Sequence, residues 1–174
     1  MGLSIAISGG IVTFSIVYAI MSFPSVVDDT TKISTAETQM ANNQFSRLQT
    51  NISISSLQDH PGNGTATFQI ANTGNTMLWN YNDFDMIITY QENATNSPVL
   101  TETLRYASSC TVLGPDQWCI AQIQNDNVNP GLLDPGETAT IDAQPAHPTN
   151  SGGAFTVEFG TDNGVTTSES VKIS

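Results

Sequence analysis

The pattern of hydrophobic positions divides the chain into two parts of different character. Residues 1–27 carry no charged side chain, and residues 3–23 are mostly Ile, Val, Leu, Phe, Met, Ala and Ser. A helix rises about 1.5 Å per residue, so about 20 apolar residues cover a hydrocarbon core of roughly 30 Å. The pattern therefore predicts one transmembrane helix within residues 1–27.

A processed N-terminus and a buried helix are the alternatives to a permanent anchor. A secretory signal has a basic start and a small-residue cleavage site, yet no Lys or Arg precedes Lys32. A pilin-like signal is cut next to a basic residue before the apolar run, and Met1-Gly2 supplies none. A soluble domain of this size has little room for a helix that is apolar on all sides. We therefore expect an anchor in the cell membrane, with the N-terminus in the cytoplasm and the rest of the chain outside.

A polar segment, residues 28–48, follows and predicts a partly helical stalk. Pro24 lacks an N–H group and is expected to end or kink the first helix. Residues 32–48 carry only a thin apolar stripe at helical spacing, formed by Ile33, Ala36, Met40 and Leu48. Such a helix is marginal by itself, so we expect it to need a partner or the following domain to stay folded.

From Thr50 onward the period of the pattern changes from helical to two. Apolar and polar residues alternate in short segments, for example those with Ile52 and Ile54, with Phe84, Met86, Ile88 and Tyr90, and with Phe155, Val157 and Phe159. This alternation is typical of strands with one buried face. Turn-forming pairs such as Asn63-Gly64 and Asn163-Gly164 separate the segments. Residues 49–174 are therefore expected to form an all-β domain, an immunoglobulin-like β-sandwich of about eight strands.

The charge of the chain restricts its partners. The 174 residues include 16 Asp or Glu against 4 Lys or Arg, which gives a net charge of −12. Such a surface repels phosphate backbones, so nucleic acid is not expected as a partner. Charged residues make up only 11% of the chain, so its solubility depends on Asn, Gln, Ser and Thr. This composition favours an extracellular or saline setting.

The two cysteines, Cys110 and Cys119, lie on either side of a predicted turn at Gly114-Pro115-Asp116. Two strand ends that flank such a loop bring the Cα atoms into disulfide range. The spacing is not that of a Cys-x-x-Cys redox motif, and a metal site would need further ligands. We therefore predict a disulfide, with two free buried thiols as the alternative.

The sequence shows no residue set that is typical of a catalytic, cofactor or metal site. His60 and His147 each precede a proline in a turn-like segment, without further ligands at metal-site spacing. No Gly-x-Ser-x-Gly motif and no glycine-rich phosphate loop occurs outside the apolar run. We therefore predict that the protein is not an enzyme and binds no cofactor or metal.

Three sites match the N-glycosylation acceptor pattern: Asn51, Asn63 and Asn93. Chance matches are common in a chain this rich in Asn, Ser and Thr. Asn63 and Asn93 lie in predicted turns, so they are better candidates than Asn51.

The order of these features resembles that of the archaellum (archaeal flagellum) accessory proteins. The resemblance rests on the Met1-Gly2 start, the uncharged helix, residues 50–54 leading into the β domain, and a polar stalk with Gln39, Gln44, Arg47 and Gln49. The segments Asn-Thr-Gly-Asn-Thr at 72–76 and Leu-Asp-Pro-Gly-Glu at 133–137 also recur in archaeal surface sandwiches. The chain is most similar to the F protein family (FlaF or ArlF), with the related G protein family second.

This resemblance implies a stator role. In the family the N-terminal helix is held in the cytoplasmic membrane, and the sandwich lies in the space beneath the S-layer. The resemblance therefore implies that this chain binds S-layer protein, forms a homodimer and pairs with the archaellum G protein, so that the rotating motor has something fixed to push against.

Two other functions stay open from the sequence. An archaellin- or pilin-like filament subunit would pack its apolar helix in a filament core, but the absent basic cleavage site and Pro24 weigh against it. A membrane-tethered enzyme or solute-binding domain is the third alternative, and the missing ligand and nucleophile clusters weigh against that.

Overall fold

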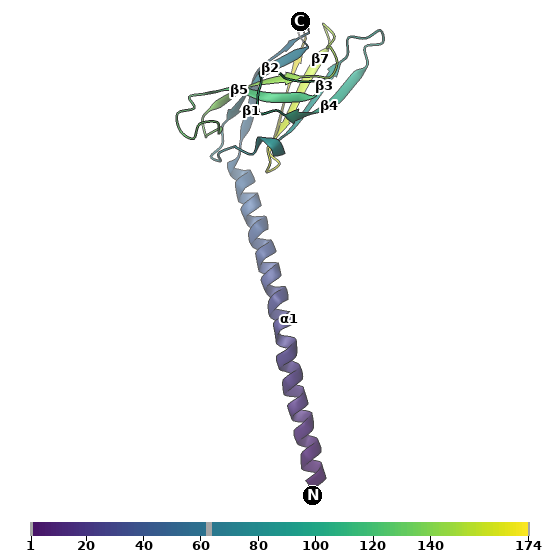
Figure 1. The fold of residues 1–174 in the computed structure, drawn as a ribbon, viewed down its shortest axis with the longest axis vertical. Helices are drawn as coiled ribbons and strands as arrows, with labels where there is room; N and C mark the ends of the chain where they lie inside the picture. The colour runs from purple at the N-terminus through teal and green to yellow at the C-terminus, as the bar shows by residue number, and fades with distance from the viewer. Residues whose placement is uncertain (1, 62–63, 174) are drawn as a thin grey trace. The chain divides into compact units, whose positions relative to one another are not determined.

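The computed structural model describes the backbone of residues 2–61 and 64–173, and the side chains of residues 7–21, 31–61 and 64–173. The chain forms two compact units, Met1–Gln44 and Phe45–Ser174. The first unit is helical, and the second contains the last turn of the helix together with all the described strands (Figure 1). The β-rich unit thus begins at Phe45, within the segment predicted as a stalk.

The helix α1, Gly2–Gln49, runs through the segments predicted as anchor and stalk. Several of its hydroxyl groups donate to the carbonyl oxygen four residues earlier: Thr13 to Gly9 (2.8 Å), Ser15 to Ile11 (2.9 Å), Thr35 to Thr31 (2.9 Å) and Thr38 to Ser34 (2.8 Å). These bonds satisfy polar side chains within the helix itself. The expectation that the helix could end at Pro24 is wrong, because a proline removes only one bond of the ladder and the turns on both sides keep the backbone helical.

Among the described residues, no helical stretch is long and apolar enough to cross a membrane. The predicted span, residues 3–23, reaches beyond the described side chains at both ends. Within the part that is described, the large apolar side chains of Ile11, Phe14, Tyr18 and Met21 are exposed. The transmembrane helix therefore stays a prediction.

Eight strands follow α1, and a short 3-10 helix, η1 (Tyr81–Asp83), precedes the third of them. The strands are β1 (Ile52–His60), β2 (Thr65–Asn72), β3 (Asp85–Gln91), β4 (Val99–Tyr106), β5 (Gln117–Gln124), β6 (Thr138–Gln144), β7 (Ala154–Gly160) and β8 (Thr166–Lys172). The prediction of a mostly β domain with about eight strands is confirmed.

The strands form one hydrogen-bonded order, β1-β2-β6-β5-β4-β3-β7-β8. Neighbours are antiparallel except β4 and β5, which are parallel and pair only at Arg105 with Gln117 and at Tyr106 with Trp118. This short link divides the sheet into the halves β1-β2-β6-β5 and β4-β3-β7-β8. Because β1 and β8 also lie near each other, the two halves enclose one core, as in a sandwich or a nearly closed barrel (Figure 1).

The core lies between the two halves. Trp118 of β5 is fully buried, and its ring centroid lies 5.5 Å from that of Phe159 in β7 and 4.8 Å from that of Tyr106 in β4. Such aromatic contacts add to the free energy gained by burying apolar surface. The alternating positions predicted to face inward are buried, among them Phe68, Ile70, Met86, Ile88, Tyr90, Ile141, Phe155 and Val157.

Two bulges change the predicted faces of their strands. In β1 the register shifts between Ser55 and Gln58, so Leu57 is buried in the core. In β5 the register shifts after Ile120, so Ile123 packs against the core where strict alternation predicted Gln122. A bulge adds one residue to one strand, which reverses the inward and outward positions beyond it.

We predict that residues 45–174 fold without the preceding helix, because the buried core belongs to that unit. Far-ultraviolet circular dichroism of this fragment should show a β spectrum, and chemical denaturation should show one cooperative transition. A helical spectrum, or unfolding without a cooperative transition, would contradict this prediction. The full chain serves as the control and should add a helical signal.

Candidate functional site

A buried asparagine, Asn72, organises one end of the β domain. Its side chain is fully buried, and its Nδ2 donates to the carbonyl oxygens of Thr76 (2.8 Å) and Leu133 (2.9 Å). Its Oδ1 accepts from the N–H of Gly74 (3.2 Å), and its own backbone N–H donates to the carbonyl of Glu137 (3.0 Å). A buried amide left without partners would cost about 1–3 kcal/mol, so Asn72 favours the arrangement in which these segments meet.

Two segments far apart in sequence, residues 72–84 and 125–137, are therefore held together. Leu78 and Leu133 form an antiparallel bridge with backbone hydrogen bonds of 3.1 and 2.9 Å. The hydroxyl of Tyr81 lies within hydrogen-bond distance of the carbonyl oxygens of Leu78 (3.1 Å) and Gly131 (3.2 Å). The backbone N–H of Asp134 donates to the Glu137 carboxylate at 2.9 Å, which fixes the second segment internally.

The last turn of α1 is bonded to two loops of the same unit. The Nδ2 of Asn163 donates to the hydroxyl oxygens of Ser46 (3.1 Å) and Thr50 (2.7 Å). On the other side, the backbone N–H of Asn75 donates to the carbonyl of Gln49 at 2.7 Å. A Cβ atom at Gly74 would lie only 2.5 Å from that Gln49 carbonyl oxygen, so the loop needs glycine there to approach the helix end.

Two large apolar side chains are exposed on the first of the paired segments, and Val128 is exposed on the second. Met77 and Trp79 are 37% and 59% exposed, and they flank the buried Leu78. Because side chains alternate across an extended strand, both lie on the opposite side of the ribbon from Leu78. The sequence analysis did not predict this pair. A signal was present, because Trp79 follows the turn segment 72–76 and lies outside every segment of alternating apolar and polar residues.

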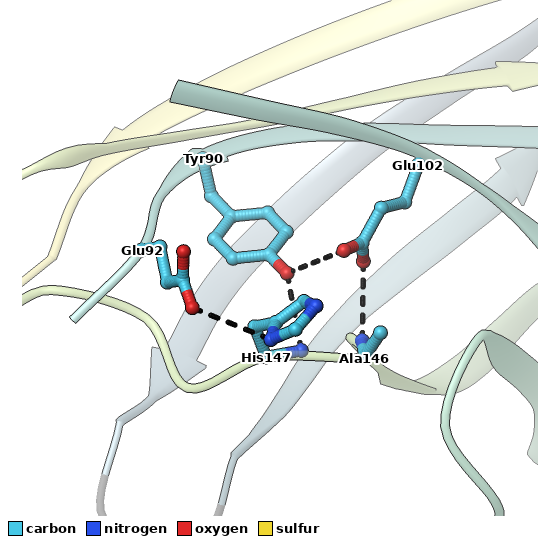
Figure 2. A network of polar contacts seen from close by, with 5 residues as sticks. All are labelled: Tyr90, Glu92, Glu102, Ala146 and His147. Atoms are coloured by element: carbon cyan, nitrogen blue, oxygen red, sulfur yellow. Dashed lines mark hydrogen bonds and ion pairs between the residues drawn. The ribbon is translucent and has the colours of Figure 1, made fainter. Parts of the chain in front are cut away.

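A second polar network joins β3, β4 and the loop after β6 (Figure 2). The hydroxyl of Tyr90 donates to the Glu102 carboxylate (2.8 Å) and accepts from the backbone N–H of His147 (3.2 Å). The other Glu102 oxygen accepts from the N–H of Ala146 (3.1 Å), and His147 Nδ1 lies 3.3 Å from a Glu92 oxygen. Figure 2 shows these groups converging from three segments, so the network holds the loop against the strands.

Burial raises the pKa of Tyr90, and its hydrogen bond to Glu102 raises the pKa further. Burial also raises the pKa of Tyr81 and of Tyr106. Both causes favour the neutral phenol, because a phenolate would have to be desolvated and would lie beside a carboxylate.

The predicted disulfide is present between Cys110 and Cys119, with a Cα–Cα distance of 5.5 Å. The two sulfur atoms and the Asp142 carboxylate lie within 4.8 Å of one another. Because the sulfurs are bonded to each other, they are not thiolate ligands, and this cluster does not offer the donors of a zinc site.

The histidines and glycosylation candidates lie in separate loops or strand ends. His60 is exposed at the end of β1, whereas His147 belongs to the network described above. Asn93 is exposed in the loop after β3, where its backbone N–H donates to the carbonyl of Pro148 (2.8 Å). Asn51 is exposed beside the helix end, and Asn63 lies outside the described residues. Glycosylation of these sites stays a prediction.

A surface hollow of about 510 Å³ lies over β3, β7 and β8. Its lining includes the carboxylates of Asp85 and Glu158 and the hydroxyls of Thr166 and Ser168. These groups accept hydrogen bonds and bind cations weakly, but the lining contains no histidine, cysteine or lysine that could act as a nucleophile or as a base near neutral pH.

No family model and no curated protein sequence matches this chain. Among solved structures, a protein of the archaeal flagellum of Methanospirillum hungatei strain JF1 is similar over 100% of this chain and 94% of its own, at 15% identity and a TM-score of 0.59. This chain shares its fold with an archaeal flagellum protein.

Two archaellum stator structures from Sulfolobus acidocaldarius are also similar. The periplasmic stator protein FlaG is 20% identical over 70% of this chain and 99% of its own, with a TM-score of 0.48. The complex of FlaF and FlaG is 17% identical over 69% and 87%, also with a TM-score of 0.48. These are the two families that the sequence resembles.

We predict that removing the disulfide lowers the free energy of unfolding by about 2–3 kcal/mol, because the closed loop restricts the unfolded chain. The double variant Cys110→Ser/Cys119→Ser should show this loss in urea denaturation under oxidising conditions. Val112→Ala is the matched control, since Val112 lies in the same loop and is 84% exposed. Equal stability of the wild type with and without reductant would contradict the prediction.

We also predict that the protein loses stability at alkaline pH. The pKa of Tyr90 in the folded state is raised above its ordinary value of 10.0, so its contribution is fully present below pH 10.0 and is lost as pH rises through the higher folded pKa. Denaturation measured across this range should show the fall, and Tyr90→Phe should make it shallower. An unchanged pH profile in Tyr90→Phe would show that Tyr90 titrates normally.

Proposed function

We propose that this chain is a membrane-anchored accessory component of the archaellum, of the stator type, and that its domain outside the membrane binds S-layer protein. The observation that carries the proposal is the likeness over the whole chain, helix and β domain together, to an archaeal flagellum protein. The resemblance of the sequence to the F and G proteins supports the stator role within that system.

The strand order supports an immunoglobulin-like sandwich as the binding domain. In such domains, strands A, B, E and D form one sheet, and strands C, F and G form the other with an added C′ strand. The halves β1-β2-β6-β5 and β8-β7-β3-β4 follow that order. Sandwiches of this kind expose loops at both ends, which suits a protein that binds other proteins.

The location outside the membrane is supported by two features. The disulfide between Cys110 and Cys119 is of a kind that persists in oxidising compartments and is rare in the cytoplasm. The apolar run at residues 3–23 has the length of a membrane span. Pairing with the archaellum G protein and homodimer formation are proposed on the family resemblance.

A filament subunit is the second candidate, because the structure similar over the whole chain is an archaeal flagellum. In a filament the apolar residues of α1, such as Phe14 and Met21, would pack against helices of neighbouring subunits instead of lipid. The two candidates differ in processing, since a subunit made through a pilin-like pathway would lose its first residues.

We predict that the native protein keeps the residues before the apolar run, and that the detergent-solubilised full chain binds purified S-layer protein without added metal or nucleotide. Intact-mass spectrometry and a pull-down measure the two expectations. An N-terminus shortened to the start of the apolar run, with recovery of archaellin filaments and no S-layer protein, would overturn the stator role in favour of the filament subunit.

A further inference from the structure

Trp79 is exposed although the fold holds its backbone firmly. The bridge between Leu78 and Leu133 fixes the residue before it, and Asn80 after it donates to the Asp83 carboxylate at 2.7 Å. A tryptophan gains more from burial than most side chains, so an ordered but 59% exposed tryptophan leaves that gain unused in the free chain. Exposed aromatic side chains on rigid supports are typical of binding hot spots.

The neighbours of Trp79 follow from the geometry of the bridge. Met77 and Trp79 flank Leu78 in sequence, and Leu132 and Asp134 flank Leu133, so the antiparallel bridge brings these four residues onto the same short ribbon. Leu132 is half-buried, which leaves part of its side chain available. We call Met77, Trp79 and Leu132, together with the acidic residues Asp83 and Asp134, the Trp79 surface.

The charged residues of the two segments that form this surface are all negative. Asp83 is exposed, and the Asp134 carboxylate is held by the Nδ2 of Asn129 at 3.1 Å. Neither of the two segments, 72–84 and 125–137, contains a lysine or arginine, and the whole chain has only 4. An apolar centre with an acidic rim is complementary to a partner that presents Arg or Lys beside apolar groups, and a guanidinium also stacks well on an indole.

We infer that the Trp79 surface is the docking site of a protein partner with a basic and apolar contact face. This inference rests on the proposed function and names the part of the domain that makes the contact. A second copy of this chain does not offer that chemistry, because its net charge is −12. An anionic lipid surface would likewise be repelled by Asp83 and Asp134.

The first test places a photoreactive phenylalanine analogue at position 79 of the full chain in living cells, with position 112 as the control. Val112 is 84% exposed in the disulfide loop, outside the Trp79 surface. The expected result is an adduct from position 79 to a Lys- or Arg-rich segment of one other protein, mapped by mass spectrometry. An adduct with a second copy or with lipid, or no adduct beyond that formed from position 112, overturns the inference.

The second test measures binding of purified S-layer protein to the detergent-solubilised full chain. Trp79→Ala should weaken binding about tenfold or more, as expected of a hot spot, whereas Val112→Ala should leave it unchanged. Asp83→Asn should make the fall of affinity with salt less steep. Equal binding by Trp79→Ala and wild type overturns the inference while the proposed function stands. If the wild type does not bind, the proposed function fails, and the adduct from position 79 decides the inference.

Discussion

The need to satisfy one buried amide, that of Asn72, holds together the end of the β domain that carries the Trp79 surface. Asn72 has no contact with solvent, and its hydrogen bonds reach its own loop, the segment at Leu133 and the segment at Glu137. In an apolar environment, each N–H or C=O group of this amide that lacked a hydrogen-bond partner would lower the free energy of unfolding by about 1–3 kcal/mol. The two segments, residues 72–84 and 125–137, are therefore held together at Asn72, and Leu78 forms its bridge with Leu133 in the same region.

The same loop also reaches the end of the helix. Gly74 and Asn75 lie against Gln49, while Asn163 bonds Ser46 from a different hairpin. The last carbonyls of a helix have no partners within the helix, so the N–H of Asn75 satisfies the Gln49 carbonyl, while the amide of Asn163 bonds the Ser46 hydroxyl oxygen.

Two polar regions of the β domain surface offer less to a partner than the Trp79 surface does. On the outward face of the half containing β3 and β7, small hydroxyl side chains bond one another, as in the pairs Thr89 with Thr101 and Thr156 with Ser170, each at 3.0 Å. At the other loops, the Tyr90 hydroxyl and the Glu102 carboxylate already bind backbone groups. Polar groups that are satisfied within the chain gain little from a partner, whereas the exposed apolar side chains of the Trp79 surface gain free energy when a partner buries them.

The sequence by itself determined the class of the fold and the inward faces of most strands. The inward positions of Met86, Ile88 and Tyr90 follow from the two-residue period of a strand and from the hydrophobic effect. The disulfide could be predicted because a turn lies between the two cysteines. The bulges that bury Leu57 and bring Ile123 inward escaped the pattern, because one extra residue in a strand leaves no mark on local composition. Tertiary structure alone decided that residues 72–76 meet residues 133–137, and that Trp79 stays exposed. Those outcomes depend on hydrogen bonds between groups about sixty residues apart, which local propensity does not encode.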